Sequence, residues 1–170
     1  DPTEWTTEHY HLIRDEIHPD GWTSLYDAIR ISIEQNRDAT RDIENSKTFM
    51  IIITDGCDNY SGFSCSQIKS EIVKHTEEGS EYIYIGANID AKQSGADIGI
   101  KIDACMQFTP NPDHTIKMFN SIGHAIQRSV TGEDRDGPQF RLHERQKSCA
   151  ETDQTLYNVG GEDDGAPRTI

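Results

Sequence analysis

The chain has 170 residues, of which 34% are hydrophobic and 27% charged, a length that fits one domain, or one domain with a tail, and leaves little room for two cores. Acidic residues number 30 and basic residues 16, so the net charge of −14 repels phosphate backbones and argues against nucleic-acid binding. No run approaches the roughly 18 to 20 apolar residues that cross a bilayer, and no signal peptide is visible, so no membrane span is expected.

Three short apolar runs predict β-strands at residues 49–53, 82–85 and, with a weaker pattern, 104–108. The first two are rich in β-branched and aromatic residues and nearly unbroken, which is typical of strands buried on both faces of a parallel sheet.

Capping residues and helical spacing predict helices between and around these strands. Ser24 caps a helix that ends near Asn36, Ser64 caps a second, and Asp90 opens a third that stops at Gly99. The last helix, 112–130, begins with Asn-Pro and is expected to cover the sheet. The side chains expected to face inward are Leu25, Ala28, Ile29, Ser32 and Ile33 in the first helix, Ile68, Ile72 and Val73 in the second, and Ile116, Phe119, Gly123, Ile126 and Val130 in the last.

The alternation of helices and strands predicts an α/β fold in which right-handed crossovers join parallel strands. Residues 18–131 form this domain, preceded by an N-terminal segment, 1–17, in which Tyr10, Ile13 and Ile17 lie at helical spacing. The remainder, 132–170, is predicted to be a polar acidic tail; its only candidate anchors are Leu156, Tyr157 and Val159.

Histidines and cysteines give no metal site by their spacing. The seven histidines share no helical face, and the cysteines contain no Cys-x-x-Cys pair that would suggest zinc: Cys57, Cys65, Cys105 and Cys149. Cys57 and Cys65 flank one short polar loop and could form a local disulfide in an oxidising compartment.

Two oxygen-bearing residues stand where an α/β sheet places its functional loops. Asp55 follows the first strand in a Thr-Asp-Gly turn, where its carboxylate could bind a hard cation or simply cap the turn. Thr23 precedes the first helix, where its hydroxyl could cap the backbone or point at a metal ion. From position alone, both alternatives stay open.

The segments 21–29 (GWTSLYDAI), 51–59 (IIITDGCDN) and 83–91 (IYIGANIDA), taken in this order, resemble the von Willebrand factor A domain, in particular its bacterial and phage-type members. The resemblance covers about residues 18–130. It implies a doubly wound, mostly parallel, Rossmann-like sheet with helices on both faces and a metal-ion-dependent adhesion site on top. It places Thr23 and Asp55 among the metal ligands, and it implies that the neighbours around them are Asp20, Ser24, Gly56, Asp58 and Asn59.

The resemblance also implies a function. Mg²⁺ or Mn²⁺ held by hydroxyls and few carboxylates stays Lewis-acidic and can bind a carboxylate from a partner protein. Trp22, beside the site, is then a candidate contact for that partner. The implied function is a protein-binding module rather than an enzyme.

One part of the family pattern is missing. The family supplies further ligands from an Asp-x-Ser-x-Ser loop after its first strand, but no such string follows an apolar run here, and the residues before 18 are too few for three strands. The chain is therefore expected to be the later part of a domain whose missing N-terminal part, with the first metal loop, lies on another chain. Alternatively, a partner protein or the tail fills the gap, or the domain is degenerate and binds no metal.

Two further functions compete with protein binding. Asp55 could act as nucleophile or Mg²⁺ ligand in a hydrolase or phosphotransferase, although Asp55 and Asp58 are three residues apart rather than two and no Gly-rich phosphate loop is present. The chain could instead be a structural assembly subunit whose open sheet edge pairs with another chain.

Overall fold

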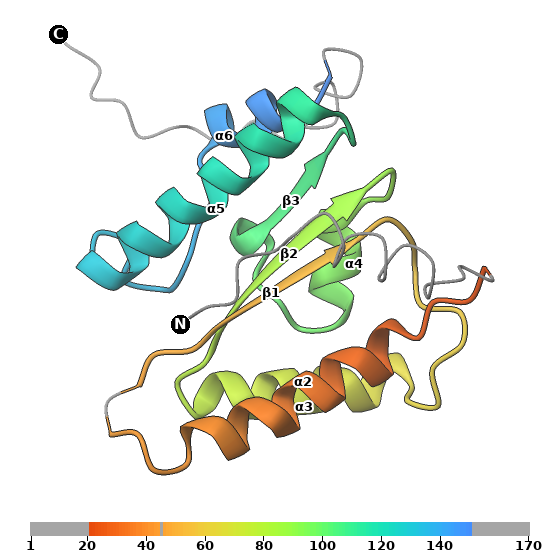
Figure 1. Cartoon of the computed structure of the whole chain (residues 1–170), viewed down its shortest axis with the longest axis vertical. Coiled ribbons are helices and arrows are strands. Elements are labelled where there is room, and N and C mark those ends of the chain that lie inside the picture. Colours follow the sequence, from red (N-terminus) through yellow and green to blue (C-terminus); the bar gives the residue numbers. More distant parts are fainter. Residues whose placement is uncertain (1–20, 45, 151–170) are drawn as a thin grey trace, which may run out of the picture.

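A computed structural model describes residues 21–44 and 46–150 as alternating helices and strands (Figure 1). In chain order these are α2 (Leu25–Thr40), β1 (Phe49–Thr54), α3 (Cys65–Glu77), β2 (Glu81–Ala87), α4 (Ala91–Asp97), the 3₁₀ turn η1 (Ile102–Ala104), β3 (Cys105–Phe108), α5 (Pro112–Thr131) and α6 (Leu142–Ser148). The predicted order of helices and strands is confirmed. The first helix runs one turn further than predicted, to Thr40. The N-terminal segment 1–17 and the three candidate anchors of the tail lie outside the described residues.

The three strands form one parallel sheet in the order β1-β2-β3. The central strand β2 is buried from Tyr82 to Ala87, as its unbroken apolar run predicts. Ile51 lies opposite Ile83 and Ile53 opposite Ile85, so these four side chains point to the same face.

Helices lie on both faces of the sheet (Figure 1). On one face α2, α3 and α4 pack over a core that contains Ile29, Ile33, Ile52, Ile68, Ile72, Tyr82, Tyr84, Ala91, Ile98, Ile100, Ala104 and Cys105. On the other face α5 packs over a core of Ile83, Ile85, Ala87, Met106, Phe108, Met118, Ile122, Ala125 and Phe140. The molecule is therefore a three-layer α/β structure, and residues 21–44 and 46–150 contain no helix long and apolar enough to span a membrane.

The helix α5 covers the sheet as predicted, but with a different face. Its buried residues are Met118, Ser121, Ile122, Ala125 and Ser129, whereas three of the apolar residues predicted to face inward are exposed: Ile116, Phe119 and Val130. Small side chains at Ser121, Ala125 and Ser129 let the helix approach the strands closely, and this packing outweighs the larger apolar residues on the neighbouring flank. Val73 in α3, also predicted to face inward, is 41% exposed.

The folded body extends beyond residue 131, where the predicted acidic tail begins. The amide of Phe140 donates to the carbonyl of Asp103 at 2.8 Å, and the amide of Thr109 donates to the carbonyl of Ser148 at 3.0 Å. Phe140 is buried, and α6 lies beside α5 (Figure 1). Residues 132–150 are thus part of the packed structure rather than of a tail, because one buried aromatic residue and a set of ion pairs anchor a segment whose average composition is polar.

Three of the four predicted helix caps are present. Ser64 forms a capping box with Gln67, Asp90 accepts from the amide of Gln93, and Asn111 accepts from the amide of His114. The fourth, Ser24, makes no side-chain cap hydrogen bond. The start of α2 is stabilised in another way, which shapes the candidate site.

Candidate functional site

The loop that follows β1 is fastened to the start of α2. The Thr23 amide donates to Asn59 Oδ1 at 2.6 Å, and the Asn59 amide donates back to the Thr23 carbonyl at 3.0 Å. The Tyr26 amide donates to Asp58 Oδ1 at 3.1 Å. These bonds take up amides that a helix leaves unpaired in its first turn, so the loop replaces Ser24 as the cap of α2.

Asp27 holds the far part of the same loop. Its amide donates to Ser61 Oγ at 3.1 Å, and its carboxylate accepts from the amides of Gly62 and Phe63 at 3.0 and 3.1 Å. Ser61 Oγ in turn donates to Asp58 Oδ1. We call this set of hydrogen bonds between residues 23–27 and 58–63 the latch. Sequence reasoning did not identify Asp27 or Ser61, although an acidic residue in the first turn of a helix was a usable signal.

The latch brings the two predicted metal ligands to the same edge of the sheet. Thr54 Oγ1 donates to the Gly56 carbonyl at 2.8 Å and accepts from the Gly56 amide at 3.3 Å, which fixes the turn that carries Asp55. A Cβ atom built on Gly56 would lie 3.9 Å from Thr23 Oγ1. The hydroxyl of Thr23 therefore lies next to the Asp-Gly turn.

Within the described residues, the side chains of Asp55 and Thr23 make no hydrogen bond or ion pair. Asp55 is exposed and Thr23 half-buried. The side chains of Asp58 and Asn59, which sequence reasoning placed around the ion, are instead engaged by the start of α2. The edge thus contains two kinds of oxygen: those that hold the loop and those left to bind something else.

An exposed aromatic pair stands beside this edge. The rings of Trp22 and Tyr60 lie 5.0 Å apart, centroid to centroid, and the two residues are 61% and 63% exposed. Trp22 was predicted as a partner contact, whereas Tyr60 was not identified from the sequence. Two large exposed aromatic side chains in contact offer the kind of surface that anchors protein partners.

The residues present fit part of a metal site. A threonine hydroxyl and a carboxylate are suitable ligands for Mg²⁺ or Mn²⁺, but an octahedral shell needs about six oxygens. Across residues 21–44 and 46–150, no group of three or more histidine, cysteine or acidic side chains could hold a metal ion. Asp20, the remaining predicted neighbour, lies outside these ranges. Thr23 and Asp55 would thus supply only a fraction of the shell.

Cys57 and Cys65 lie at the two ends of the loop, and both are free thiols in the structure. Tyr26, between the loop and the core, has a pKa raised to about 12, first by burial and then by the neighbouring Cys65 and Asp58. The hydrogen bonds of the latch, rather than a bond between these two thiols, fasten the loop in the structure.

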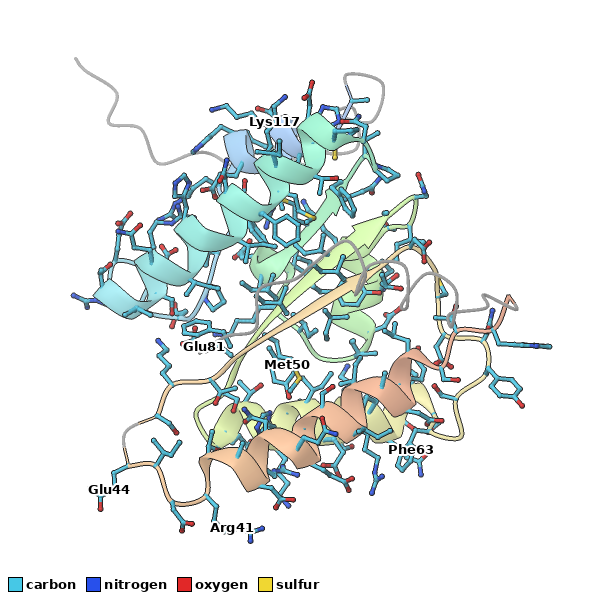
Figure 2. All side chains as sticks on the ribbon, viewed as in Figure 1. Arg41, Glu44, Met50, Phe63, Glu81 and Lys117 are labelled. Atoms are coloured by element: carbon cyan, nitrogen blue, oxygen red, sulfur yellow. The ribbon has the colours of Figure 1, made fainter. Side chains whose placement is uncertain are left out.

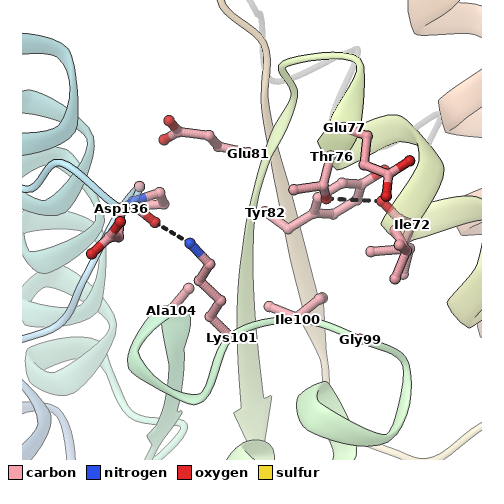
Figure 3. A pocket seen from close by; sticks show the side chains of 13 residues that line it. Ile72, Thr76, Glu77, Glu81, Tyr82, Gly99, Ile100, Lys101, Ala104 and Asp136 are labelled. Carbon is pink, nitrogen blue, oxygen red and sulfur yellow. Dashed lines mark hydrogen bonds between the residues drawn. The ribbon is translucent and has the colours of Figure 1, made fainter.

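A separate pocket of about 170 Å³ opens at the opposite edge of the sheet, between α3 and the loop before α6 (Figure 3). Its walls include Ile72, Val73 and Ile100, and across it the Lys101 ammonium donates to the Asp136 carbonyl at 2.5 Å. Because it opens beside Glu81, at the start of β2, it lies away from Thr23 and Asp55 and is not part of the candidate site.

Comparison with known proteins does not add to these observations, since no family model, curated protein or solved structure matches the chain.

Proposed function

We propose that this chain is a non-enzymatic protein-binding module that uses Mg²⁺ or Mn²⁺ at the carboxyl edge of its sheet. The observation that carries the proposal is the division of labour in the candidate site: Asp27, Asp58 and Asn59 hold the loop, while the side chains of Thr23 and Asp55 are left together without a described partner. The fold we propose is the doubly wound von Willebrand factor A type, of which residues 21–150 would form the later part.

Each residue has a defined task in this proposal. Asp55 and Thr23 supply two oxygens, directly or through water, and Ser24 lies beside them with a hydroxyl that makes no cap bond. When bound, the ion acts as a Lewis acid toward a carboxylate of the partner. In this proposal the remaining ligands come from an Asp-x-Ser-x-Ser segment on another chain. Trp22 and Tyr60 add apolar contact beside the ion.

The test uses the paramagnetism of Mn²⁺. Mn²⁺ titrated into the ¹⁵N-labelled chain should broaden the amide signals of residues near Thr23 and Asp55 first. We expect weak binding, because two protein oxygens leave most of the shell to water. Asp55→Asn should remove the broadening, since an amide oxygen is a poorer ligand for a hard cation.

Asp42→Asn serves as the matched control. Asp42 is also exposed, but it follows α2, whose last residues lie near Arg41 and Glu44, far from Phe63 in the latch (Figure 2). Broadening that survives Asp55→Asn, or that is lost equally with Asp42→Asn, would mean nonspecific attraction of cations to an acidic protein and would overturn the proposal.

A structural assembly role is the second candidate, and one observation favours it. β1 is an edge strand of the sheet formed by residues 21–44 and 46–150. Its residues Ile51 and Ile53 are 41% and 45% exposed, although parallel sheets are normally covered on both faces. Light scattering over a range of protein concentrations tests this role. A monomer at all concentrations would count against it.

The hydrolase alternative is weakened because Asp58, its second carboxylate, already accepts hydrogen bonds from the Tyr26 amide and the Ser61 hydroxyl.

A further inference from the structure

The pocket at the start of β2 has an apolar floor. The floor consists of four side chains that are at most 5% exposed: Ile72, Tyr82, Ile100 and Ala104. The Tyr82 hydroxyl lies 2.6 Å from His75 Nδ1, so Tyr82 offers a ligand its ring rather than a free polar atom. The floor therefore favours an apolar group.

The volume of the pocket limits the size of that group. An apolar cavity of about 150 Å³ holds one benzene molecule, whereas pockets for drug-sized ligands measure about 300 to 1,000 Å³. The present pocket measures about 170 Å³. It therefore has room for one benzene-sized ring, or for a branched chain of similar size.

Two glycines with positive φ shape the walls of the pocket. Gly99, with φ +88°, brings the loop after α4 against α3, where a Cβ atom built on it would lie 3.3 Å from Val73 Cγ2. Gly137, with φ +98°, lies against β2, where a Cβ atom would lie 3.6 Å from Glu81 Cδ. Other residues adopt such φ values only with strain. The backbone therefore fixes both walls, which lowers the entropy that binding a ligand loses.

The charges at the rim favour a cation over an anion. Among the described residues that line the pocket, the carboxylates are those of Glu77, Glu81 and Asp136, and the ammonium is that of Lys101. Glu81 is paired with Lys47 at 2.8 Å, and Lys101 reaches across to donate to the Asp136 carbonyl at 2.5 Å (Figure 3). The carboxylates of Glu77 and Asp136 are exposed and make no hydrogen bond or ion pair among the described residues. They therefore attract a cationic group at the rim and repel an anionic one.

We propose that this pocket binds a small primary amine that carries one benzene-sized apolar group. The apolar group lies on the floor, and the ammonium lies at the rim beside Glu77 and Asp136. The pocket opens at the start of β2, whereas Thr23 and Asp55 lie at the carboxyl edge of the sheet. Amine binding is therefore independent of the proposed metal site, and either proposal can fail without the other.

NMR titration of the ¹⁵N-labelled full chain tests the floor and the rim separately. The probes are benzylamine, benzyl alcohol and benzoate, which share a ring and differ in charge. Benzylamine should shift the amide signals of residues 72–77, 99–104 and 136–138 saturably, with a dissociation constant on the order of 1 mM for a ligand of this size. Benzyl alcohol should bind at least about threefold more weakly, and benzoate more weakly still.

Paired substitutions at the rim test the selection of a cation. Glu77→Gln combined with Asp136→Asn should lower the affinity for benzylamine to that for benzyl alcohol and leave the affinity for benzyl alcohol unchanged. Asp42→Asn combined with Glu44→Gln is the matched control, because it removes the same charge from two exposed residues that do not line the pocket. This control pair should leave both affinities unchanged.

A substitution at the mouth tests the place of the ring. Val73, at 41% exposed, has room for a larger side chain, so Val73→Trp should fill the mouth and remove the binding of both benzylamine and benzyl alcohol. Ile31→Trp, at a residue of α2 that is 50% exposed, should leave binding unchanged. Circular dichroism checks that both variants are folded. A folded Val73→Trp variant that still binds benzylamine would overturn the proposal.

Three further results would overturn it. The first is a titration in which benzylamine causes no saturable shifts in the pocket residues. The second is benzyl alcohol or benzoate binding as tightly as benzylamine, because the rim would then not select a cation. The third is an equal loss of benzylamine affinity in the rim pair and the control pair, which would mean general attraction to a chain of net charge −14.

Discussion

Two polar regions of this molecule use their charges in opposite ways. Between α5 and α6, the Arg128 guanidinium binds Asp134 Oδ2 at 3.1 Å and Glu144 Oε2 at 2.9 Å, and both acidic residues are about 95% buried. At the carboxyl edge of the sheet, the carboxylate of Asp55 is exposed and has no partner among the described residues. Where charges are buried, they satisfy one another and serve the fold. The exposed carboxylate of Asp55 supports no described group and remains available to a ligand.

The α5–α6 cluster keeps its charges at neutral pH. The hydrogen bond from Arg128 to Glu144 raises the pKa of the guanidinium. Burial alone would raise the pKa of Glu144, but the hydrogen bonds from Arg128 and from the Arg141 amide outweigh it, so this pKa is lowered. The cluster is therefore an ionic clamp between α5 and residues 134–144.

The largest expected effect comes from breaking this clamp. Arg128→Met removes the guanidinium that bridges the buried Asp134 and Glu144 and leaves them with the side chain and the amide of Arg141 as donors, which should lower the free energy of unfolding by about 3 to 5 kcal/mol in urea denaturation. Arg41→Met is the control, because the Arg41–Asp38 pair is 72% exposed on both sides and should cost less than about 1 kcal/mol. Equal losses for the two variants would show that residues 134–144 do not depend on Arg128.

Removing one acceptor of the latch should lower the free energy of unfolding less than breaking the clamp does. Asp58→Ala removes the acceptor of the Tyr26 amide and a partner of Ser61, so we expect a loss of about 1 to 2 kcal/mol, the usual cost of a helix N-cap. Circular dichroism with urea denaturation measures it. Asp58→Asn keeps an oxygen acceptor and should recover most of the loss. An alanine variant as stable as the wild type would mean that the latch does not hold the start of α2.

The sequence predicted the fold better than the packing. Buried strands and three caps, at Ser64, Asp90 and Asn111, depend on neighbours along the chain and were predicted correctly. The inward face of α5 was not, because Phe119 and its apolar neighbours satisfy helical spacing as well as the face that is buried. Which flank faces the strands is decided by close packing of small side chains, a tertiary property that spacing does not encode.

In the candidate site, too, some features could be predicted from the sequence and others could not. Residue type and position at strand ends were enough to select Thr23 and Asp55. The roles of Asp58 and Asn59 could not be predicted, because their partners, the amides of Tyr26 and Thr23, lie more than thirty residues earlier in the chain. Polar loop residues near a ligand look alike in a sequence, and only the fold separates those that hold the loop from those left free.

A third polar region, around His75, is buried like the α5–α6 cluster but consists of neutral side chains. The imidazole of His75, 2% exposed, lies 2.6 Å from the Tyr82 hydroxyl and 2.9 Å from Ser80 Oγ. Burial, and then the charge of Arg37, lower the pKa of His75 below its ordinary 6.5. Below about pH 6.5 the unfolded chain therefore binds a proton that the folded chain does not, so the stability is complete above this pH and declines as the pH falls.

Urea denaturation at about pH 7.5 and about pH 5.5 measures this decline. The expected loss is about 1.4 kcal/mol for each unit by which the pKa is lowered, within the pH range between the two values. His75→Gln should be less stable at both pH values but should show a smaller difference between them. An NMR titration in which His75 protonates at or above pH 6.5 would contradict the burial argument.

The smallest expected effect on stability is at Asp55, and this is what separates the carboxyl edge from the other polar regions. Because its carboxylate is exposed and supports no described group, Asp55→Asn should change the free energy of unfolding by less than about 0.5 kcal/mol in urea. The same substitution should remove Mn²⁺ broadening around Thr23. A loss above about 1 kcal/mol would mean that Asp55 caps its own turn, the alternative that position alone left open. An unchanged free energy of unfolding together with lost Mn²⁺ binding would show instead that the Asp55 carboxylate serves metal binding and does not stabilise the fold.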